Sequence, residues 1–507
     1  MWRFFTHIVW LSFALSGCVE WGSTATVGTL DEATEGNETV TDPSDSTDAS
    51  NGNEGSDDRI PGTEVSVSFA ATQCIFYVAV DERGDGSGTT WENATPYLRQ
   101  ALEAGEQNLD AGQCDEITVK IGDGLFLPHP SDPSMSFPLY GELNLRGGYL
   151  ETDEESRDLN SVQTILAGRV GEGGPQSYHV LRGSGSGTDE VRLDGLTIQE
   201  GRALGDGEDA RGGGIFSTGL ILSLSNVTVR DNFAVERGGG LWLDGGQLVE
   251  GQVLWQDNLS DGDGGALFAR QARAYPYFAD YRDNRALRGG AIYIQNTFDW
   301  FLQRTHFQGN IATAGGAVYA EAGEGLKVCR TFWVGNNATQ GGGLYVDRVS
   351  KFSVASAVFT HNQAEIGASL YTKDISDMGL SHLTLTENGD VGLSNIAVFG
   401  ADPWSIHNSI LWRNGIEFEA DVAPQLEYNL LDSTVNLDGS NVSGEPGFLA
   451  PFSSAPESWD LSVRSDSLVI DAGADGLTRQ DFCNQDVNAG PRRVGEAVDI
   501  GAYEYAP

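Results

Sequence analysis

Between residues 206 and 420, large apolar side chains return at one fixed place in a run of alternating apolar and polar residues. Each large residue has a smaller residue two positions before it and an asparagine three positions after it. Alternation with a period of two predicts β-strands with one buried face. The large residues predicted to face inward are Val229, Trp255, Tyr281, Phe307, Trp333, Phe359, Leu385 and Leu411.

The asparagines of this pattern recur every 26 residues without interruption. A fixed period of this length predicts a solenoid in which each coil stacks on the next. We expect the asparagines to form a structural ladder at one corner, because asparagine tolerates a left-handed backbone and stacked amides can bond between coils. The ladder consists of Asn232, Asn258, Asn284, Asn310, Asn336, Asn362, Asn388 and Asn414.

Glycine pairs mark a second corner in each coil, where a positive φ or a close backbone approach excludes a Cβ atom. They open phrases such as GGAIY at Gly289 and GGAVY at Gly315, each of which predicts a further strand. The phrase at Gly289 arrives one residue early, whereas the asparagine spacing stays constant. The asparagine corner is therefore expected to be the part of the coil that does not shift.

Residues 63–205 are predicted to form an N-terminal cap and the first coils. A short amphipathic helix, with Ala94, Tyr97, Leu98, Ala101 and Leu102 on one face, is expected to end at Gly105 and to cover the open edge of the first coil. Residues 206–420 form the regular repeats, and residues 421–507 form the last coils and a C-terminal cap. Strands before the repeats are predicted at 74–80, 117–121, 143–146, 164–167, 179–181 and 191–198.

Cys74 and Cys114 each precede an early strand, and an exported chain permits a disulfide bond between them across the cap. Cys329 and Cys483 remain as a possible second pair. Close to the C-terminus, charged residues stand where the stack of coils must end, which favours a hydrogen-bonded cap over the last coil. These residues are Asp471, Arg492, Arg493 and Asp499.

Residues 1–18 have the pattern of a targeting signal, with Arg3 before an apolar stretch too short to span a bilayer. The segment ends Leu15-Ser16-Gly17-Cys18, which resembles the lipobox of bacterial lipoproteins. That resemblance implies diacylation of the Cys18 thiol, with palmitate as a typical acyl chain, and sorting to the outer membrane. An ordinary signal peptide is the alternative. Residues 19–62 are acidic and almost free of apolar side chains, which predicts a disordered tether.

The motif Phe307-Gln308-Gly309-Asn310 and the neighbouring GGA[ILV] phrases resemble the repeats of polymorphic outer membrane proteins. The repeat as a whole resembles a right-handed parallel β-helix of the pectate-lyase-like class, and this resemblance covers residues 74–505. It implies an all-β solenoid of 26-residue coils with a short N-terminal capping helix. It indicates the fold and does not indicate one activity, because this fold serves many functions.

The chain has 507 residues, with 30 Lys and Arg against 73 Asp and Glu and a net charge of −43, so nucleic acid is not expected as a partner. Few lysines occur in the repeat, and no string typical of a catalytic site appears, so no catalytic residue, metal site or cofactor is assigned. Clustered acidic residues are candidates for a Ca²⁺ site, and solvated turn residues are the alternative. They are Asp206, Glu208, Asp209, Asp261 and Asp263.

One aromatic side chain per coil is predicted to point outward. An exposed strip of this kind would stack on sugar rings, whereas a ladder of rings stacked on one another under loops is the alternative that the pattern favours. His382 and His407 are candidates for neighbours on adjacent coils, and unrelated histidines in surface turns are the alternative. The aromatic file consists of Phe216, Trp242, Phe268, Tyr293, Tyr319, Tyr345 and Tyr371.

These patterns lead to the hypothesis of a lipid-anchored protein of the cell surface with a non-enzymatic adhesion, interaction or envelope-structural role. Its expected partners are the membrane, through the lipid, and glycans or another surface protein. The alternative hypothesis is a polysaccharide lyase or glycoside hydrolase that acts on acidic polysaccharide. A cleft in which Asp, Arg or Lys side chains converge from neighbouring coils would favour the enzyme.

Overall fold

A computed structural model describes residues 72–506, except 130, 154, 170–175, 390–392, 433–438, 451–459 and 478–481. All the described residues belong to one compact unit, Ile60–Pro507. The predicted signal segment 1–18, with Cys18, and the predicted tether 19–62 lie outside the described residues. Within the described part of the chain, none of the helices is long and apolar enough to cross a membrane.

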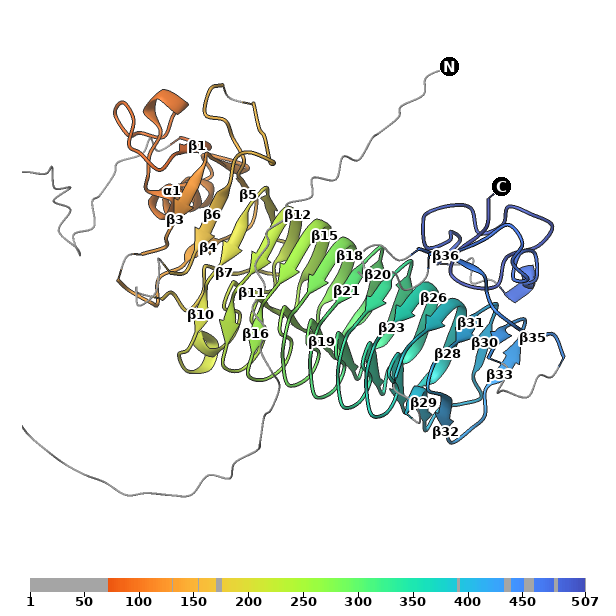
Figure 1. Cartoon of the computed structure of the whole chain (residues 1–507). Coiled ribbons are helices and arrows are strands. Elements are labelled where there is room, and N and C mark those ends of the chain that lie inside the picture. The colour runs from red at the N-terminus through yellow and green to blue at the C-terminus, as the bar shows by residue number, and fades with distance from the viewer. Residues whose placement is uncertain are drawn as a thin grey trace, which may run out of the picture. The chain divides into compact units, whose positions relative to one another are not determined.

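The described strands wind into a parallel β-helix, in which each strand pairs with its counterparts one coil before and one coil after (Figure 1). In the coil around Trp255, β14 (Leu241–Asp244) forms one face, β15 (Gln247–Gln256) bends around the next, and β16 (Leu259–Ser260) forms a short third face. Val229, Trp255 and Tyr281 pair in register on three successive coils. The predicted all-β solenoid of 26-residue coils is confirmed.

Each face of the β-helix is one sheet. The face that contains β14 also has β4 (Phe137–Leu139), β7 (Leu181–Ser184), β11 (Ile215–Thr218), β17 (Leu267–Arg270), β19 (Ile292–Gln295), β22 (Val318–Glu321), β25 (Leu344–Asp347), β27 (Leu370–Lys373), β29 (Ser394–Phe399) and β32 (Ile416–Ala420). The face that contains β15 has β1 (Ile75–Val78), β2 (Ile117–Ile121), β3 (Gly124–Phe126), β5 (Leu143–Arg146), β6 (Thr164–Ala167), β8 (Glu190–Asp194), β9 (Thr197–Gln199), β12 (Ile221–Arg230), β18 (Arg273–Arg282), β20 (Phe298–Gln303), β21 (His306–Gln308), β23 (Glu324–Cys329), β24 (Phe332–Val334), β26 (Ser350–Thr360), β28 (Ser376–Thr386), β30 (Ser405–His407), β31 (Ile410–Trp412), β33 (Gln425–Glu427), β34 (Leu430–Leu431) and β35 (Val442–Ser443). The third face is a small sheet of β10 (Arg202–Ala203), β13 (Phe233–Ala234) and β16, in that order. Two further strands, β36 (Phe448–Ala450) and β37 (Asp460–Val463), form an antiparallel pair. The other described elements are the helix α1 (Leu98–Asp110) and the 3-10 turns η1 (Trp91–Asn93), η2 (Gly207–Ala210) and η4 (Asp475–Leu477).

The interior of the β-helix is filled by the residues that the alternation predicts. Every predicted large residue from Val229 to Leu411 is buried. The aromatic members stack along the axis, with ring centroids 5.1 Å apart for Tyr281 and Phe307 and 4.2 Å apart for Phe307 and Trp333. These rings form a continuous core, so each coil is stabilised by its neighbours.

The asparagine ladder is confirmed as a chain of buried amides. The Asn310 Nδ2 group donates to Tyr281 O (2.9 Å) and to Asn336 Oδ1 (2.9 Å), and the Asn310 backbone N–H donates to the same Oδ1 (3.0 Å). The Asn310 Oδ1 atom in turn accepts both the backbone and side-chain donors of Asn284. Every donor and acceptor of the buried amide is therefore satisfied.

The prediction that these asparagines adopt a left-handed backbone is wrong. The residue before each of them has the positive φ instead, for example Asp283 (54°), Gly309 (65°) and His361 (56°). The left-handed residue turns the chain, and the asparagine after it points its amide inward along the axis. Its position therefore follows from hydrogen bonding between coils.

The glycine pairs do take the predicted corner. Gly315 has a φ of 64°, and a Cβ atom there would lie 2.4 Å from the Val318 carbonyl oxygen. At the early phrase, β17 pairs with β19 so that Leu267 lies opposite Ile292. The hydrogen bond between Asn258 and Asn284 still forms, so this coil is one residue shorter between its asparagine corner and its glycine corner.

The N-terminal cap differs from the prediction in the length of its helix. α1 continues through Gly105 to Asp110, and Gly112 takes the left-handed conformation (φ 65°) that ends it. Gly105 serves packing, because a Cβ atom there would lie 2.7 Å from the Tyr140 hydroxyl and 2.8 Å from the Ile117 side chain.

Two of the predicted early strands differ in their bounds. The strand predicted at 191–198 is interrupted, because Gly195 (φ 72°) separates β8 from β9. The strand predicted at 179–181 lies later in the chain, as β7.

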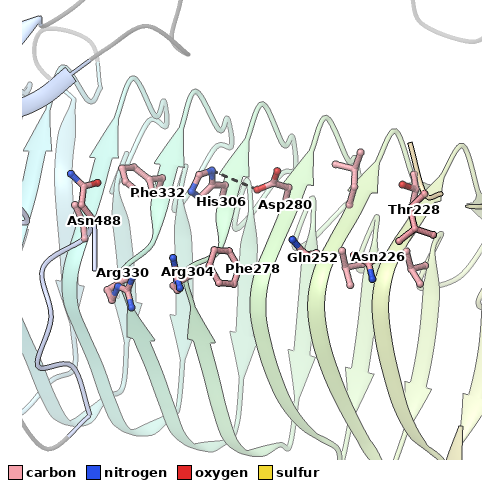
Figure 2. A pocket seen from close by; sticks show the side chains of 15 residues that line it. Asn226, Thr228, Gln252, Phe278, Asp280, Arg304, His306, Arg330, Phe332 and Asn488 are labelled. Atoms are coloured by element: carbon pink, nitrogen blue, oxygen red, sulfur yellow. Dashed lines mark ion pairs between the residues drawn. The ribbon is translucent and has the colours of Figure 1, made fainter. Parts of the chain in front are cut away.

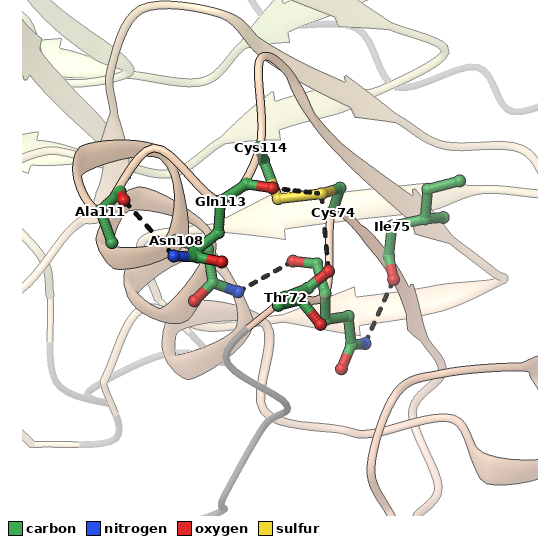
Figure 3. The surroundings of a disulfide bond; sticks show 8 residues. Thr72, Cys74, Ile75, Asn108, Ala111, Gln113 and Cys114 are labelled. Carbon is green, nitrogen blue, oxygen red and sulfur yellow. Dashed lines mark hydrogen bonds between the residues drawn. A yellow bond between two sulfur atoms is a disulfide. The ribbon is translucent and has the colours of Figure 1, made fainter.

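The predicted disulfide bond between Cys74 and Cys114 is present, with a Cα–Cα distance of 5.7 Å (Figure 3). It joins the start of the first strand to the loop after α1. Asn108 of α1 adds a hydrogen bond from its Nδ2 group to the Gln73 carbonyl oxygen (2.9 Å). Helix and first strand are thus tied together at the end of the stack.

The C-terminal segment, residues 482–506, lies along the side of the β-helix. Cys483 forms the second disulfide bond with Cys329 of β23, and the Cα–Cα distance is 5.7 Å. Further along, the Ala502 N–H donates to Thr384 Oγ1 (3.0 Å) of β28. The segment thus spans several consecutive coils, and the prediction that it sits over the last coil is wrong.

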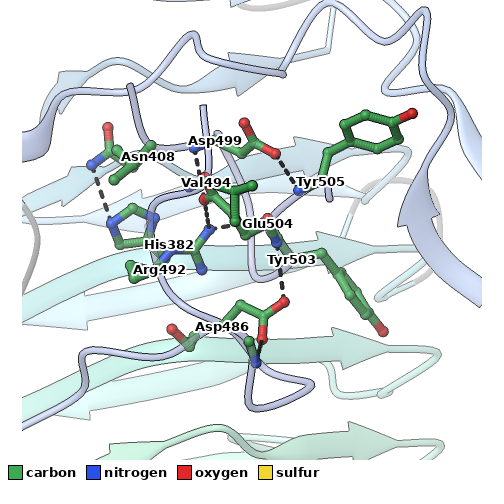
Figure 4. A network of polar contacts seen from close by, with 12 residues as sticks. His382, Asn408, Asp486, Arg492, Val494, Asp499, Tyr503, Glu504 and Tyr505 are labelled. Carbon is green, nitrogen blue, oxygen red and sulfur yellow. Dashed lines mark hydrogen bonds and ion pairs between the residues drawn. The ribbon is translucent and has the colours of Figure 1, made fainter. Parts of the chain in front are cut away.

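The predicted charged cluster does hold this segment together (Figure 4). The buried Arg492 pairs with Glu504 (3.2 Å) and donates to the Ala502 carbonyl oxygen (3.0 Å). Asp499 accepts hydrogen bonds from the backbone N–H groups of Asp471 (2.7 Å) and Tyr505 (2.6 Å). Arg493 lies apart from this cluster and pairs with Asp475 (2.8 Å).

Candidate functional site

A groove with a volume of about 780 Å³ runs along the outer side of the β-helix, across the bend of the long strands. We call it the axial groove. Figure 2 shows polar and aromatic side chains from successive coils pointing into it. Its lining residues are Leu159, Asn226, Val227, Thr228, Gln252, Val253, Leu254, Phe278, Asp280, Arg304, His306, Arg330, Phe332, Val487 and Asn488.

The lining residues come from two columns of the repeat. One column lies six residues before each ladder asparagine and has a left-handed backbone, which bends the long strand at this point. The other column lies four residues before each asparagine, in the strand that follows the bend. The first column contains Asn226, Gln252, Phe278, Arg304 and Arg330, and the second contains Thr228, Leu254, Asp280, His306 and Phe332.

Two arginines give the groove its positive charge. The Arg304 guanidinium lies 3.5 Å from the centre of the Phe278 ring, and its Nη1 group donates to the Tyr277 hydroxyl (2.9 Å). Arg330 is only 4% exposed, and its Nη1 group donates to Gln485 Oε1 (2.7 Å). The Arg330 Nε atom is buried and has no hydrogen-bond partner among the described residues.

The electrostatic effects that oppose the charge of Arg330 are the larger ones. Burial lowers its pKa, and the positive charge of Arg304 lowers it further, while Tyr277 and Asp486 raise it by smaller amounts. Neither guanidinium forms an ion pair within the described part of the chain. A buried cation without a paired anion is unfavourable, so this pair is suited to receive an anion from outside.

A carboxylate and an imidazole face each other in the second column. The His306 Nδ1 atom lies 3.5 Å from Asp280 Oδ1, and the His306 ring contacts the Phe332 ring at 4.8 Å. Desolvation lowers the pKa of His306 and Asp280 raises it, while Arg282, which pairs with Asp280 (2.6 Å), lowers it further. The imidazole is therefore mainly neutral at pH 7 and can accept a proton.

Exposed aromatic rings lie at the edge of the groove. Tyr277 and Phe278 are 39% and 40% exposed, and their rings make an edge-to-face contact at 4.7 Å. Exposed rings beside arginine and amide groups offer both stacking surfaces and hydrogen-bond donors. This combination matches a ligand that carries sugar rings and negative charge.

The five acidic residues considered for Ca²⁺ do not converge on one site. Glu208 and Asp209 pair with Arg182, the latter at 3.0 Å. Asp263 is buried between Arg288 (2.8 Å) and Arg237 (3.4 Å), whereas Asp206 and Asp261 are exposed on turns. Among the described residues, no group of three or more His, Cys, Asp or Glu side chains could hold a metal ion.

The aromatic file is covered and does not form an exposed strip. All seven rings from Phe216 to Tyr371 are 9% exposed or less. Trp242 and Phe268 stack at 4.6 Å with an angle of 5° between them, and the guanidinium groups of Arg211 and Arg237 each lie 5.0 Å from one of these rings. The alternative of a self-stacking ladder is confirmed.

The histidines of adjacent coils also differ in part from the prediction. His407 lies opposite Ser381, so His382 and His407 are on neighbouring coils as predicted. His382 is 1% exposed and contacts the Asn408 amide (3.3 Å) under the C-terminal segment. It is therefore a buried structural residue and does not lie in a surface turn.

No protein-family model matches the chain. No curated protein matches it in sequence. Among solved structures, it is similar to pectate lyase Pel9A, with 12% identity and a TM-score of 0.35 over 87% of this chain and 98% of that one. It is also similar to tailspike protein 3 of bacteriophage CBA120, with 10% identity and a TM-score of 0.29 over 71% and 64% of the two chains. The A-module of the mannuronan C-5 epimerase AlgE4 of Azotobacter vinelandii has 15% identity and a TM-score of 0.25 over 64% and 93%.

Proposed function

We propose that this protein is a lipid-anchored protein of the cell surface that binds an anionic polysaccharide in the axial groove. The observation that carries the proposal is the pair Arg304 and Arg330, which form no ion pair with any described residue and lie beside exposed aromatic rings. The contrast with the aromatic face supports it. On the aromatic face, Arg182, Arg211 and Arg288 all pair with carboxylates.

The chemical class of the ligand follows from charge and shape. The chain has a net charge of −43, so most of its surface repels an anion, whereas the two arginines of the groove attract one. The groove extends across successive coils and offers amides from Asn226 and Gln252 as well as the arginines. Carboxylate or sulfate groups would pair with the guanidinium groups, and the amides would bond to hydroxyl groups.

Binding of the purified mature chain to immobilised alginate, polygalacturonate and neutral dextran tests the proposal. We expect binding to the two acidic polymers, with little to dextran. Arg330→Gln should weaken it by about ten- to hundredfold, because one charge-assisted hydrogen bond contributes about 1.5–3 kcal/mol. Arg348→Gln is the matched control, because Arg348 is an exposed arginine paired with Glu321 outside the groove. Equal effects of both substitutions would refute the role of the groove.

The lipid anchor is tested separately, since it depends on Cys18. Cells that express the chain are labelled with a palmitate analogue and then fractionated. The wild-type chain should carry the label and remain with the outer membrane, whereas Cys18→Ser should lose the label and appear in the soluble fraction. Digestion of the wild-type chain by protease added to intact cells would show display on the outer face.

The Asp280–His306 pair favours a second candidate function, cleavage of the same polysaccharide by β-elimination. In that reaction neutral His306 accepts the proton next to the carboxylate of a uronic acid unit, and the electron pair of that C–H bond forms a C=C double bond as the adjacent C–O bond breaks. The departing oxygen takes a proton from water, and the arginines neutralise the carboxylate. Hydrolysis is less suited to the site, because it requires two carboxyl groups and Asp280 is the one carboxylate among the lining residues. Ultraviolet absorbance of the unsaturated product, lost in His306→Ala while binding persists, is the test.

A further inference from the structure

The two columns that line the axial groove continue beyond it, and there the C-terminal segment covers them. In the second column, Phe332 is followed by Val358, Thr384 and Ile410 on the next three coils. Val358 and Ile410 are buried in one apolar cluster with Ile500 and Ala502. The groove is therefore the open part of a surface whose remainder is filled by the protein's own chain.

The C-terminal segment begins to cover the first column at Gln485. Gln485 contacts two successive coils, since its Oε1 accepts from Arg330 (2.7 Å) and its carbonyl oxygen accepts from the Ser356 hydroxyl (2.8 Å). Asn488 lines the same end of the groove as Arg330 and Phe332 (Figure 2). The disulfide bond between Cys329 and Cys483 fixes this wall to the coil that carries Arg330.

At the opposite end of the groove the lining residue is Leu159. Leu159 packs against Gly195, in the coil before the one that carries Asn226. Its side chain is 43% exposed, and it is a single residue of a loop. A chain that lies in the groove is thus stopped at the Asn488 end and can leave over Leu159.

The open length sets how many sugar units fit. The first column offers five residues from Asn226 to Arg330, which at the spacing of adjacent strands span about 19 Å. One pyranose unit of an extended chain advances by about the distance between two coils, so the groove accommodates about four or five units.

On this geometry, and on the basis of the proposed function, we infer that the groove recognises one end of an anionic polysaccharide chain. The terminal unit lies against Asn488 and pairs with Arg330, and the chain then runs past Phe278 towards Leu159. An internal segment of a long polymer cannot occupy the same place, because its continuation would collide with the wall at Gln485 and Asn488. The protein therefore binds each polymer chain once.

Stoichiometry distinguishes this inference from lateral binding. Alginate and polygalacturonate are each cut to defined lengths, and the number of protein molecules bound per unit mass is measured at saturation. End binding predicts that the number of sites increases in proportion to the number of chains. Lateral binding predicts a constant number of sites per unit mass, and that result would overturn the inference. Absence of binding to both polymers would instead refute the proposed function.

Length dependence gives a second readout. The dissociation constant of an oligosaccharide should fall with each added unit up to about four or five units, and should change by less than about twofold beyond that length. A dissociation constant that continues to fall in longer oligosaccharides would show that the wall does not limit the site.

Removal of the wall should convert end binding into lateral binding. Cys329→Ser/Cys483→Ser releases the segment from the coil of Arg330, and the long polymer should then bind several protein molecules per chain. Cys74→Ser/Cys114→Ser removes the other disulfide bond, far from the groove, and should leave one molecule per chain. If the first variant fails to fold, Asn488→Gly reports on the same contact and should weaken the binding of short oligosaccharides while leaving the thermal stability unchanged. Equal affinity of Asn488→Gly and the wild type for a tetrasaccharide would contradict a terminal site at this residue.

Discussion

Substitution of Glu250 by glutamine tests the account of the core, because this carboxyl group lies inside the β-helix. Glu250 is 2% exposed, and it lies opposite Leu224 and Pro276 in the neighbouring coils. The Tyr281 hydroxyl donates to its Oε2 atom (2.9 Å), and the Trp255 indole N–H donates to Oε1. Burial raises its pKa from 4.5 to about 7, because the two hydrogen bonds offset only part of the desolvation.

The sign of the pH effect follows from this shift. The folded chain binds the Glu250 proton more tightly than the unfolded chain, so its contribution to stability is fully present below pH 4.5 and is lost as the pH rises through about 7. At 1.36 kcal/mol for each pH unit between the two pKa values, the loss amounts to about 3 kcal/mol. Glutamine keeps the size of the side chain and an acceptor for Trp255, but it cannot ionise.

We therefore expect Glu250→Gln to be more stable than the wild type by about 3 kcal/mol at about pH 8 and to differ little from it at about pH 4.5. Urea unfolding followed by tryptophan fluorescence at both pH values measures this difference. Glu324→Gln, at an exposed glutamate, is the control and should show neither effect. Parallel pH profiles for Glu250→Gln and the wild type would refute the assignment of a protonated carboxyl group to the core.

Three further predictions concern the corners and the groove. Asn336→Ala should destabilise the chain by about 2–6 kcal/mol in urea unfolding, because two buried donors of the previous ladder amide lose their acceptor, whereas the exposed Asn337→Ala should have little effect. Gly315→Ala and Gly335→Ala both place a side chain at a left-handed residue, but only the Cβ atom at position 315 would collide with a backbone oxygen. We expect Gly335→Ala to lower the free energy of unfolding by about 1–2 kcal/mol and Gly315→Ala to lower it by clearly more, as measured by thermal unfolding. Affinity for alginate, measured by calorimetry, should increase as the pH falls below about 6.5, because protonation of His306 adds a positive charge, and His306→Ala should remove this increase.

The repeat could be predicted from the sequence because its determinants are local and periodic. The inward side chains, the ladder amides and the glycine corners all contact equivalent residues of the neighbouring coils. The structure of one coil therefore predicts that of the next. The error at the asparagines arose because asparagine is suited both to a left-handed backbone and to amide stacking. Only the structure shows that the residue before it, such as Asp283, makes the turn.

Glu250 could have been located from the same pattern. It lies two residues after the buried Leu248 and five before Trp255, in a strand that bends at Gln252. Its place in the alternation is therefore inward, but a glutamate is normally expected on the surface. Two hydrogen-bond donors make this exception tolerable, and one of them, Tyr281, comes from the next coil.

The groove could be predicted only in part. Counting back six and four residues from each ladder asparagine gives the two columns, and the unlike residues there, such as Phe278, Arg304 and His306, distinguish these coils from the rest. The disulfide bond between Cys329 and Cys483 was a candidate from the sequence, but the position of the wall was not, because no pattern in the sequence places Gln485 against Arg330. The periodic pattern contains no information about a segment that returns from outside the repeat.

The distribution of arginines argues that the groove is a site of binding and not a gap in packing. With 73 acidic against 30 basic residues in the chain, a carboxylate is easily supplied to any arginine that needs one for stability. Arg237 and Arg288 on the aromatic face both pair with the single buried carboxylate of Asp263. Arg330 is as deeply buried as Asp263, yet its hydrogen-bond partner is the neutral Gln485. Burial and the charge of Arg304 outweigh the charge of Asp486, so the free energy of the empty site is raised. Two arginines that form no ion pair with any described residue are stabilised when an anion enters the groove, which is the energetic basis for the binding proposed here.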